Sequence, residues 1–510
     1  MSALALLAFG LLAQPDSTPD RDPPGWGPVS IQDERFDPDL VEELMRAYRE
    51  LGPVEAPPLG GGRPLPLDRV IASTEAHHPN LREATAELRS AEGQRLAARG
   101  GFDPKLSVKG GAVPQGYYDV DAIETKLAQP TPLWGTEFFA GYRVEESTNI
   151  ATYDDRETLD GGEVKGGFRI PVLLDGPIDA RRAGVRTAQL GVEAAEASRE
   201  LTRLELNLGA TEAYWNWVAA GEGLRVALEL VRLAERRGDQ IEVQVSEGAA
   251  PQIYRAENLR SLLKRRDKLV ESTRKLEKAA IKLSLFFRDD DGAPVAPPPS
   301  RLPPAVPVAE APPPAARARG IERALERRPE LVELAKRRDA ARVDGELADN
   351  GILPRLDLSL SIAKDLGSDP EASTVEKLDP LDVKAGLMFE LPLLLRKGRG
   401  KAASSWAKVD KAEAKLRFTE DKVRAQVQDV WSRLMASVNR ARVARQGAVV
   451  AAAVAAGERV RLREGATSPF VLNLREQAAA DAKLVEISAR ADLQVALTAW
   501  RLVTMADALR

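Results

Sequence analysis

Few residues in this 510-residue chain have the types and spacing that catalysis or metal binding requires. The only two histidines, His77 and His78, are adjacent and stand directly before Pro79, so we expect them in a solvated loop or at a packed helix end. A metal site would need ligands that converge from several parts of the chain. No cysteine is present, which excludes thiolate ligands, a cysteine nucleophile and disulfides. Phosphate-binding glycine loops and a Ser-His-Asp arrangement are also missing, so the sequence predicts no enzyme and no cofactor.

The composition favours long helices with one wet face over a large compact core. Aromatic residues make up only 5% of the chain and charged residues 29%. The formal net charge of −4 gives no reason to expect nucleic acid as a partner.

The N-terminus is predicted to be a secretory signal peptide. Residues 1–13 form a short apolar run with Ala13 as a small residue for cleavage, although no Lys or Arg precedes the run. No other stretch has the length and apolarity of a membrane-spanning helix. If the protein lies in a membrane, we expect it there as a β-barrel.

Four landmarks recur in the same order in the two halves, which indicates an internal duplication. The first-half landmarks are His78-Pro79-Asn80-Leu81, Phe168-Arg169-Ile170-Pro171, Trp215 and Glu247-Gly248-Ala249. Their counterparts are Arg328-Pro329-Glu330-Leu331, Phe389-Glu390-Leu391-Pro392, Trp431 and Glu464-Gly465-Ala466. We therefore expect an N-terminal extension rich in proline and glycine (14–66), a first repeat (67–292), a proline-rich, extended and solvated linker (293–318) and a second repeat (319–510).

Each repeat is predicted to contain an opening helix, strands and a long helical hairpin. The opening helices are expected at 67–100 and 321–350, and the hairpins at about 179–287 and 402–508. A helix of about 65 residues would extend about 100 Å, which suits a rod or a tunnel. Apolar spacing predicts the packed face of the last helix, which would consist of Leu474, Ala478, Ala482, Val485, Ala489, Leu493 and Ala496.

Strands are expected at about 104–171 and 354–391. The stretch 356–362 alternates apolar and polar residues, as the strands of transmembrane barrels do. Aromatic residues gather in the first of these regions, where they would lie at the lipid–water boundary or, alternatively, pack a small soluble β-subdomain. The acidic segment 145–163 is expected to be a solvated loop outside the cell.

From about residue 65 onward, these features resemble the TolC-like family of outer-membrane factors, or outer membrane efflux proteins. The motifs that carry the resemblance are the two Pro-containing helix openings, the strand starts at Pro104 and Pro354, the strand-to-helix turns at Pro171 and Pro392, and the Gly-Ala hairpin tips. The resemblance implies a mainly α fold with a transmembrane β-barrel, built from a duplicated helix–strands–long helical hairpin. Three copies would form one trimeric β-barrel continued by an α-helical barrel.

The resemblance also implies partners and a location. A homotrimer in outer-membrane lipid of a Gram-negative bacterium, with a periplasmic helical tunnel, would dock a periplasmic adaptor (membrane fusion protein) linked to an inner-membrane pump. The channel would give substrates passive passage in efflux or type I secretion. The docking tips in this sequence would be Gly248, Ala249, Ala250, Pro251, Gly465, Ala466, Thr467, Ser468 and Pro469.

One departure from the family concerns the inner aperture, which some members close with acidic residues just after the second tip. In this chain no Asp or Glu occurs there before Glu476, and Asn473 is the nearby polar candidate. The alternative function, a soluble periplasmic or cytosolic coiled-coil scaffold, would explain the helices but not strands at equivalent places in both repeats.

Overall fold

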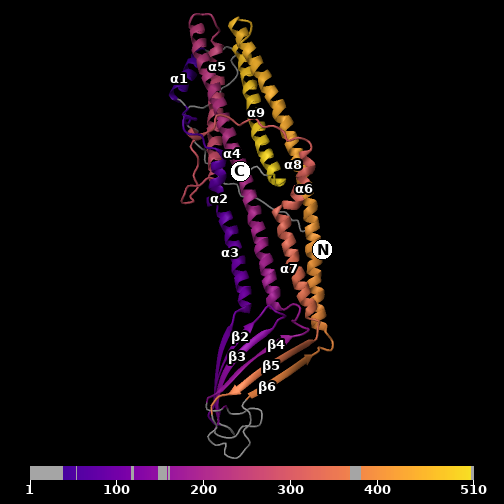
Figure 1. The fold of residues 1–510 in the computed structure, drawn as a ribbon. Helices are drawn as coiled ribbons and strands as arrows, with labels where there is room; N and C mark the ends of the chain where they lie inside the picture. The colour runs from indigo at the N-terminus through magenta and orange to yellow at the C-terminus, as the bar shows by residue number, and fades with distance from the viewer. Residues whose placement is uncertain are drawn as a thin grey trace, which may run out of the picture.

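The structure is a computed structural model that describes residues 38–52, 54–115, 120–147, 158, 161–367 and 381–506. The molecule is elongated, with a β-sheet at one end, two helical hairpins whose tips form the other end, and shorter helices alongside (Figure 1). It is mainly helical, with a single six-stranded antiparallel sheet among the described residues.

The helices follow the duplication. The extension contains α1 (Pro38–Glu50), the first half α2 (Leu67–His77), α3 (Pro79–Arg99), α4 (Ala180–Ser246) and α5 (Ile253–Ser284), and the second half α6 (Ala316–Arg327), α7 (Pro329–Asn350), α8 (Arg396–Arg463) and α9 (Pro469–Val503). Two short 3-10 helices lie at Gly100–Phe102 and Pro299–Arg301. With 67 and 68 residues, α4 and α8 each extend about 100 Å.

Each opening helix lies close to its predicted range but is divided in two directly before a proline, and at Pro79 this agrees with the helix end expected at His77 and His78. His78 and Arg328 have extended backbones, with ψ of 128° and 130°, between α2 and α3 and between α6 and α7. A residue that precedes proline is driven out of the helical conformation by the proline ring. In α3 the His78 ring accepts a hydrogen bond from the Asn80 amide, so this histidine is a helix cap.

Six strands form a sheet in which every neighbour in sequence is also a neighbour in space. The strands are β1 (Lys105–Val113), β2 (Val120–Pro130), β3 (Glu137–Ser147), β4 (Glu163–Pro171), β5 (Arg355–Asp365) and β6 (Leu381–Glu390). The β4–β5 pair joins the two repeats, with Phe168 opposite Leu360. Most of the acidic segment 145–163 lies outside the described residues.

The linker differs from the solvated connector that its composition predicts. Leu302 and Val306 are buried, and Leu302 packs against Gly221 of α4. The Val306 amide donates to the Glu222 carboxylate at 2.6 Å, and Arg490 of α9 donates to the Val306 carbonyl at 2.9 Å. Proline prevents the linker from forming a helix, but it does not prevent side chains of the linker from being buried. The extended linker lies between α4 and α9 and makes hydrogen bonds to both.

The packed face predicted for α9 is correct only in the half distant from the tip. Ala489, Leu493 and Ala496 are buried, but Leu474 and Val485 are about half exposed. Near the tip the buried face instead carries Leu472, Asn473, Glu476 and Ala480. The apolar periodicity gives the wrong face there because two of the residues that point inward are polar.

Candidate functional site

The two hairpin tips lie together at the end of the molecule opposite the sheet (Figure 1). Gly248 and Gly465 each end a long helix with φ of +72°, a conformation that glycine adopts without strain. The next amides, Ala249 and Ala466, donate to carbonyls five residues back, at 2.8 and 2.9 Å. Sequence reasoning thus located both turns correctly.

The surface of the tips differs between the repeats. Gly248, Ala249, Pro251, Gly465 and Ala466 are exposed. Ala250, Thr467 and Ser468 are half-buried, and Pro469 is buried at the start of α9. The Ser468 hydroxyl caps α9 by accepting from the Val471 amide. Whether these residues bind an adaptor stays a prediction.

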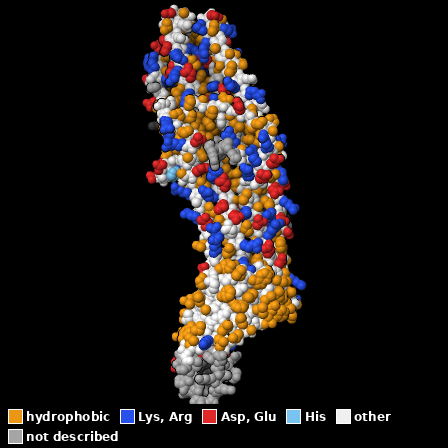
Figure 2. Space-filling model, viewed as in Figure 1, with side chains coloured by type: hydrophobic (Ala, Val, Ile, Leu, Met, Phe, Trp, Pro, Cys, Tyr) orange, Lys and Arg blue, Asp and Glu red, His pale blue; other side chains and the backbone are white. Residues whose placement is uncertain are grey.

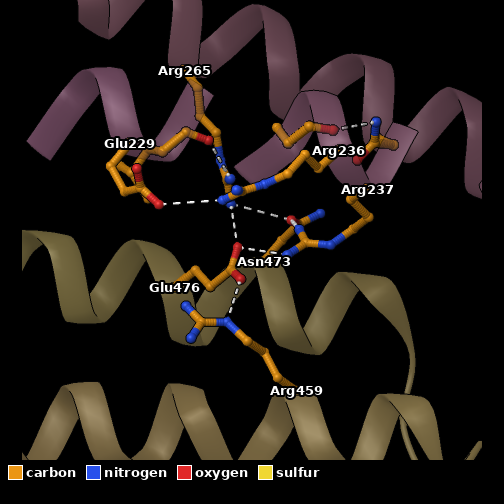
Figure 3. Close-up of polar contacts among 10 residues, drawn as sticks. Glu229, Arg236, Arg237, Arg265, Arg459, Asn473 and Glu476 are labelled. Atoms are coloured by element: carbon orange, nitrogen blue, oxygen red, sulfur yellow. Dashed lines mark hydrogen bonds and ion pairs between the residues drawn. The ribbon is translucent and has the colours of Figure 1, made fainter. Parts of the chain in front are cut away.

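Behind the tips, four helices contribute to a charge cluster (Figure 3). It consists of the buried residues Arg237 of α4, Arg265 of α5, and Asn473 and Glu476 of α9, together with Arg459 of α8, whose side chain is 45% exposed. The Glu476 carboxylate lies 2.7 Å from Arg237, 3.0 Å from Arg265 and 3.1 Å from Arg459. The side chain of Glu476 is 1% exposed and that of Arg265 3%. The cluster therefore joins the first hairpin to the second close to their tips.

Electrostatics keep Glu476 ionised despite its burial. Burial alone would raise the pKa of this carboxyl, but the hydrogen bonds and positive charges of Arg237 and Arg265 outweigh burial and lower the pKa. One carboxylate faces three guanidinium groups, so the attraction within this cluster depends on a single negative charge.

Asn473 lies in this cluster and points into the protomer. Its side-chain oxygen accepts hydrogen bonds from Arg237 and, at 3.3 Å, from Arg265. Its side chain is buried and already engaged within the protomer. Its predicted role at an inner aperture is untested, but its direct contacts are with arginines of the first hairpin.

Sequence reasoning missed Arg237, Arg265 and Arg459, and took Glu476 only as the first acidic residue after the tip. One signal was available. Asn473 and Glu476 are three residues apart and therefore lie on one helical face. Their arginine partners are 17 to 239 residues away in sequence, and only the packing of four helices brings them together.

At the opposite end, the two faces of the sheet differ in chemistry. Because strand side chains alternate, the register places one set on each face. The apolar face includes Leu106, Leu127, Phe138, Phe168, Leu360, Ile362, Val383 and Leu387. The polar face includes Lys105, Lys126, Glu137, Lys165, Arg169, Asp357 and Lys384. Phe139 is an exception among the aromatics, since it lies on the polar face beneath Lys126.

Hydrophobic side chains cover much of the sheet end, while charged side chains dominate along the helices (Figure 2). Among the described residues, no group of acidic or histidine side chains could hold a metal ion. No helix in the part of the chain that the structure describes is long and apolar enough to cross a bilayer.

The fold is that of solved outer-membrane channels. The chain superposes on CmeC of Campylobacter jejuni with a TM-score of 0.59 and 14% identity, over 86% of this chain and 85% of CmeC. For VceC of Vibrio cholerae the TM-score is 0.58, with 15% identity over 86% of this chain and 95% of VceC. For MtrE of Neisseria gonorrhoeae it is 0.59, with 14% identity over 86% and 88%.

Sequence comparison finds a family match within the second repeat. Residues 320–504, most of the second repeat, match the family described as outer membrane efflux protein. The resemblance seen in the motifs is thereby confirmed. No curated protein matches the chain in sequence. The alternative of a soluble coiled-coil scaffold finds no support in these comparisons.

Proposed function

We propose that this protein is the outer-membrane channel of a tripartite efflux or type I secretion system, through which substrates pass to the exterior without catalysis. The observation that carries the proposal is the combination of two structures in one protomer. A sheet with one apolar and one charged face continues into helical hairpins about 100 Å long. The strands have 9 to 11 residues, the length that spans a bilayer.

The sheet supports an assembly of several copies because it has two free edges, and three is the number of copies that the family resemblance implies. Among the described residues, β1 and β6 each pair with only one neighbouring strand. In lipid, unpaired backbone groups are costly, so the edges of separate copies would pair and close one barrel. The apolar face would then contact lipid, and the charged face would line the passage.

The tips support docking of a periplasmic adaptor that connects to an inner-membrane pump. They are the parts of both hairpins farthest from the sheet (Figure 1). An added Cβ at Gly248 or Gly465 would meet no atom within 4 Å, so the protomer leaves space at both turns for a partner.

The test is fractionation of cells that express the full chain. We expect the protein in the outer-membrane fraction, extracted only by detergent, and migrating as a trimer after mild crosslinking. A monodisperse monomer that is released without detergent would contradict the proposal.

A further inference from the structure

The start of α8 carries cations that have no partner in the protomer. Arg396, Lys397, Lys401 and Lys408 are exposed, and none forms an ion pair or side-chain hydrogen bond with the residues that the structure describes. Lys397, Lys401 and Lys408 follow helical spacing and share one face of α8. We call these four residues the α8 basic cluster.

This arrangement is unfavourable for an isolated helix. Positive charges near a helix N-terminus oppose the helix dipole, and the first turn of α8 contains no acidic residue. Lys397 and Lys401 are four residues apart and repel each other. A negatively charged partner outside the protomer would remove both penalties.

The duplicated position in the first repeat provides an internal comparison. The start of α4 also carries arginines, but each has an acidic partner. Arg182 pairs with Asp179 at 2.7 Å, Arg181 with Glu137 at 3.7 Å, and Arg186 with Glu346 at 3.2 Å. The absence of partners is therefore a property of α8 and does not follow from the strand-to-helix turn itself.

The basic cluster lines an open groove of about 1060 Å³ between α8, α7 and the turn after β4. Asp175 and Asp344 are the acidic residues in its lining, and neither forms an ion pair with the cluster. Leu394 also lines the groove and is 66% exposed, and the neighbouring Leu393 is 89% exposed. The groove thus joins cations to exposed leucines.

These leucines continue the apolar face of the sheet. Leu387 and Phe389 of that face are 68% and 61% exposed, and they lead through Leu391 to Leu393 and Leu394. Figure 2 shows hydrophobic side chains gathered where β6 meets α8, with Lys and Arg at the edge of the patch. Cations therefore stand at the boundary where the apolar surface ends.

We propose that the α8 basic cluster binds the phosphate headgroups of anionic phospholipid in the leaflet that faces the helices, with Leu393 and Leu394 against the acyl chains. The inference rests on the proposed function, because it requires the sheet to lie in a membrane. A phospholipid matches both halves of the surface, since its phosphate complements the cations and its chains cover the leucines. A soluble anion would account for the cations alone.

The test compares the wild type with a variant in which all four cations are neutralised: Arg396→Gln, Lys397→Gln, Lys401→Gln and Lys408→Gln. The control neutralises four exposed cations farther along α8 for which no partner is seen: Lys411→Gln, Lys415→Gln, Arg417→Gln and Arg445→Gln. Each detergent-purified full-length protein is titrated with phosphatidylglycerol, phosphatidylcholine or inorganic phosphate. Bound lipid is counted by native mass spectrometry, and the thermal midpoint is recorded.

We expect phosphatidylglycerol to bind to the wild type and the control and to raise their thermal midpoints. The cluster variant should bind phosphatidylglycerol at least about tenfold more weakly. Unchanged phosphatidylglycerol binding by the cluster variant would overturn the proposal. So would an equal effect of phosphatidylcholine or of inorganic phosphate. Loss of the oligomer in the cluster variant alone would assign the cations to a second copy of the chain and also overturn it.

Failure of this inference is distinguishable from failure of the proposed function. Membrane extraction and oligomeric state are measured on the wild type without added lipid. A wild type that is extracted as a trimer but binds phosphatidylglycerol no better than the cluster variant refutes only the lipid site. A wild type that never enters the membrane refutes the proposed function.

Discussion

At the scale of single residues, Glu476 is the one negative charge that holds arginines from three other helices. Replacing it by glutamine would leave Arg237 and Arg265 buried without a counter-charge. We expect Glu476→Gln to lower the free energy of unfolding by about 3 kcal/mol. The control is Asp492→Asn, which removes the exposed ion pair with Arg440 and should cost about 0–1 kcal/mol. Equal effects of the two substitutions in denaturant titrations would contradict the importance of the cluster.

The same comparison has a defined pH dependence. Because the pKa of Glu476 in the folded protein lies below its ordinary value of 4.5, its stabilising contribution is complete above that value. It disappears as the pH falls below 4.5 and through the lowered pKa. The stability difference between the wild type and Glu476→Gln should therefore be constant near neutral pH and shrink in acid. A difference that grows on acidification would show that the sign is wrong.

Substitutions at the tip glycine Gly465 can distinguish the effect of backbone strain from steric obstruction of the docking surface. Gly465 has φ of +72°, so a side chain there costs about 1–2 kcal/mol from the backbone, and an added Cβ would meet no atom within 4 Å. We expect Gly465→Trp to form normal oligomer but to lose export, because the ring occupies the docking surface. Gly465→Asn, which tolerates this backbone conformation, should keep export. Lys415→Trp, on the exposed surface of α8, is the control for the effect of a bulky side chain away from the tips. Normal export by Gly465→Trp would contradict a docking role for Gly465 and would show that this residue only forms the turn.

At the scale of elements, the linker acts as a strap between the two long hairpins. Arg490 of α9 binds both the Val306 carbonyl and the Glu222 carboxylate, at 2.9 and 2.8 Å. Arg490→Met would leave Glu222 buried without its cation and release the linker. We expect faster cleavage by trypsin after Arg301 and Arg317 and a loss of about 3 kcal/mol in stability.

The matched control for the linker is Arg440→Met, which removes an exposed ion pair from α8 in the same hairpin. It should change neither the tryptic pattern nor the stability beyond about 1 kcal/mol. If Arg490→Met is cleaved no faster than Arg440→Met, the linker is held by its apolar contacts through Leu302 and Val306 and not by the ionic ones.

At the scale of the whole molecule, the orientation of the sheet in the membrane can be tested with two neighbouring residues. Leu387 and Met388 are both more than half exposed in the protomer but lie on opposite faces of β6. An arginine on the lipid face costs up to about 2–4 kcal/mol at the bilayer centre and less toward its surfaces. We expect Leu387→Arg to reduce the yield of membrane-inserted oligomer.

Met388→Arg should be tolerated, because that side chain lies on the charged face opposite Asp357. The measurement is the amount of heat-modifiable oligomer in outer-membrane fractions of the two variants. A larger loss for Met388→Arg than for Leu387→Arg would mean that the charged face, and not the apolar one, contacts lipid.

The sequence alone determined the features that depend on local chemistry. Glycine followed by proline fixes a helix reversal, so the tips at Gly248 and Gly465 were located to the residue. Alternation fixes which side chains share a strand face, so the two-faced character of β5 followed from its own residues. The repeated landmarks likewise placed equivalent elements in both halves.

Only the tertiary structure decided the features that depend on distant partners. The buried face of α9 near its tip carries Asn473 and Glu476, and these polar residues are stable there only because Arg237 and Arg265 reach them from another hairpin. Proline content predicted the extended shape of the linker, but its burial depends on α4 and α9. In both cases the cost of burying a polar group is offset by a partner that no local pattern in the sequence identifies.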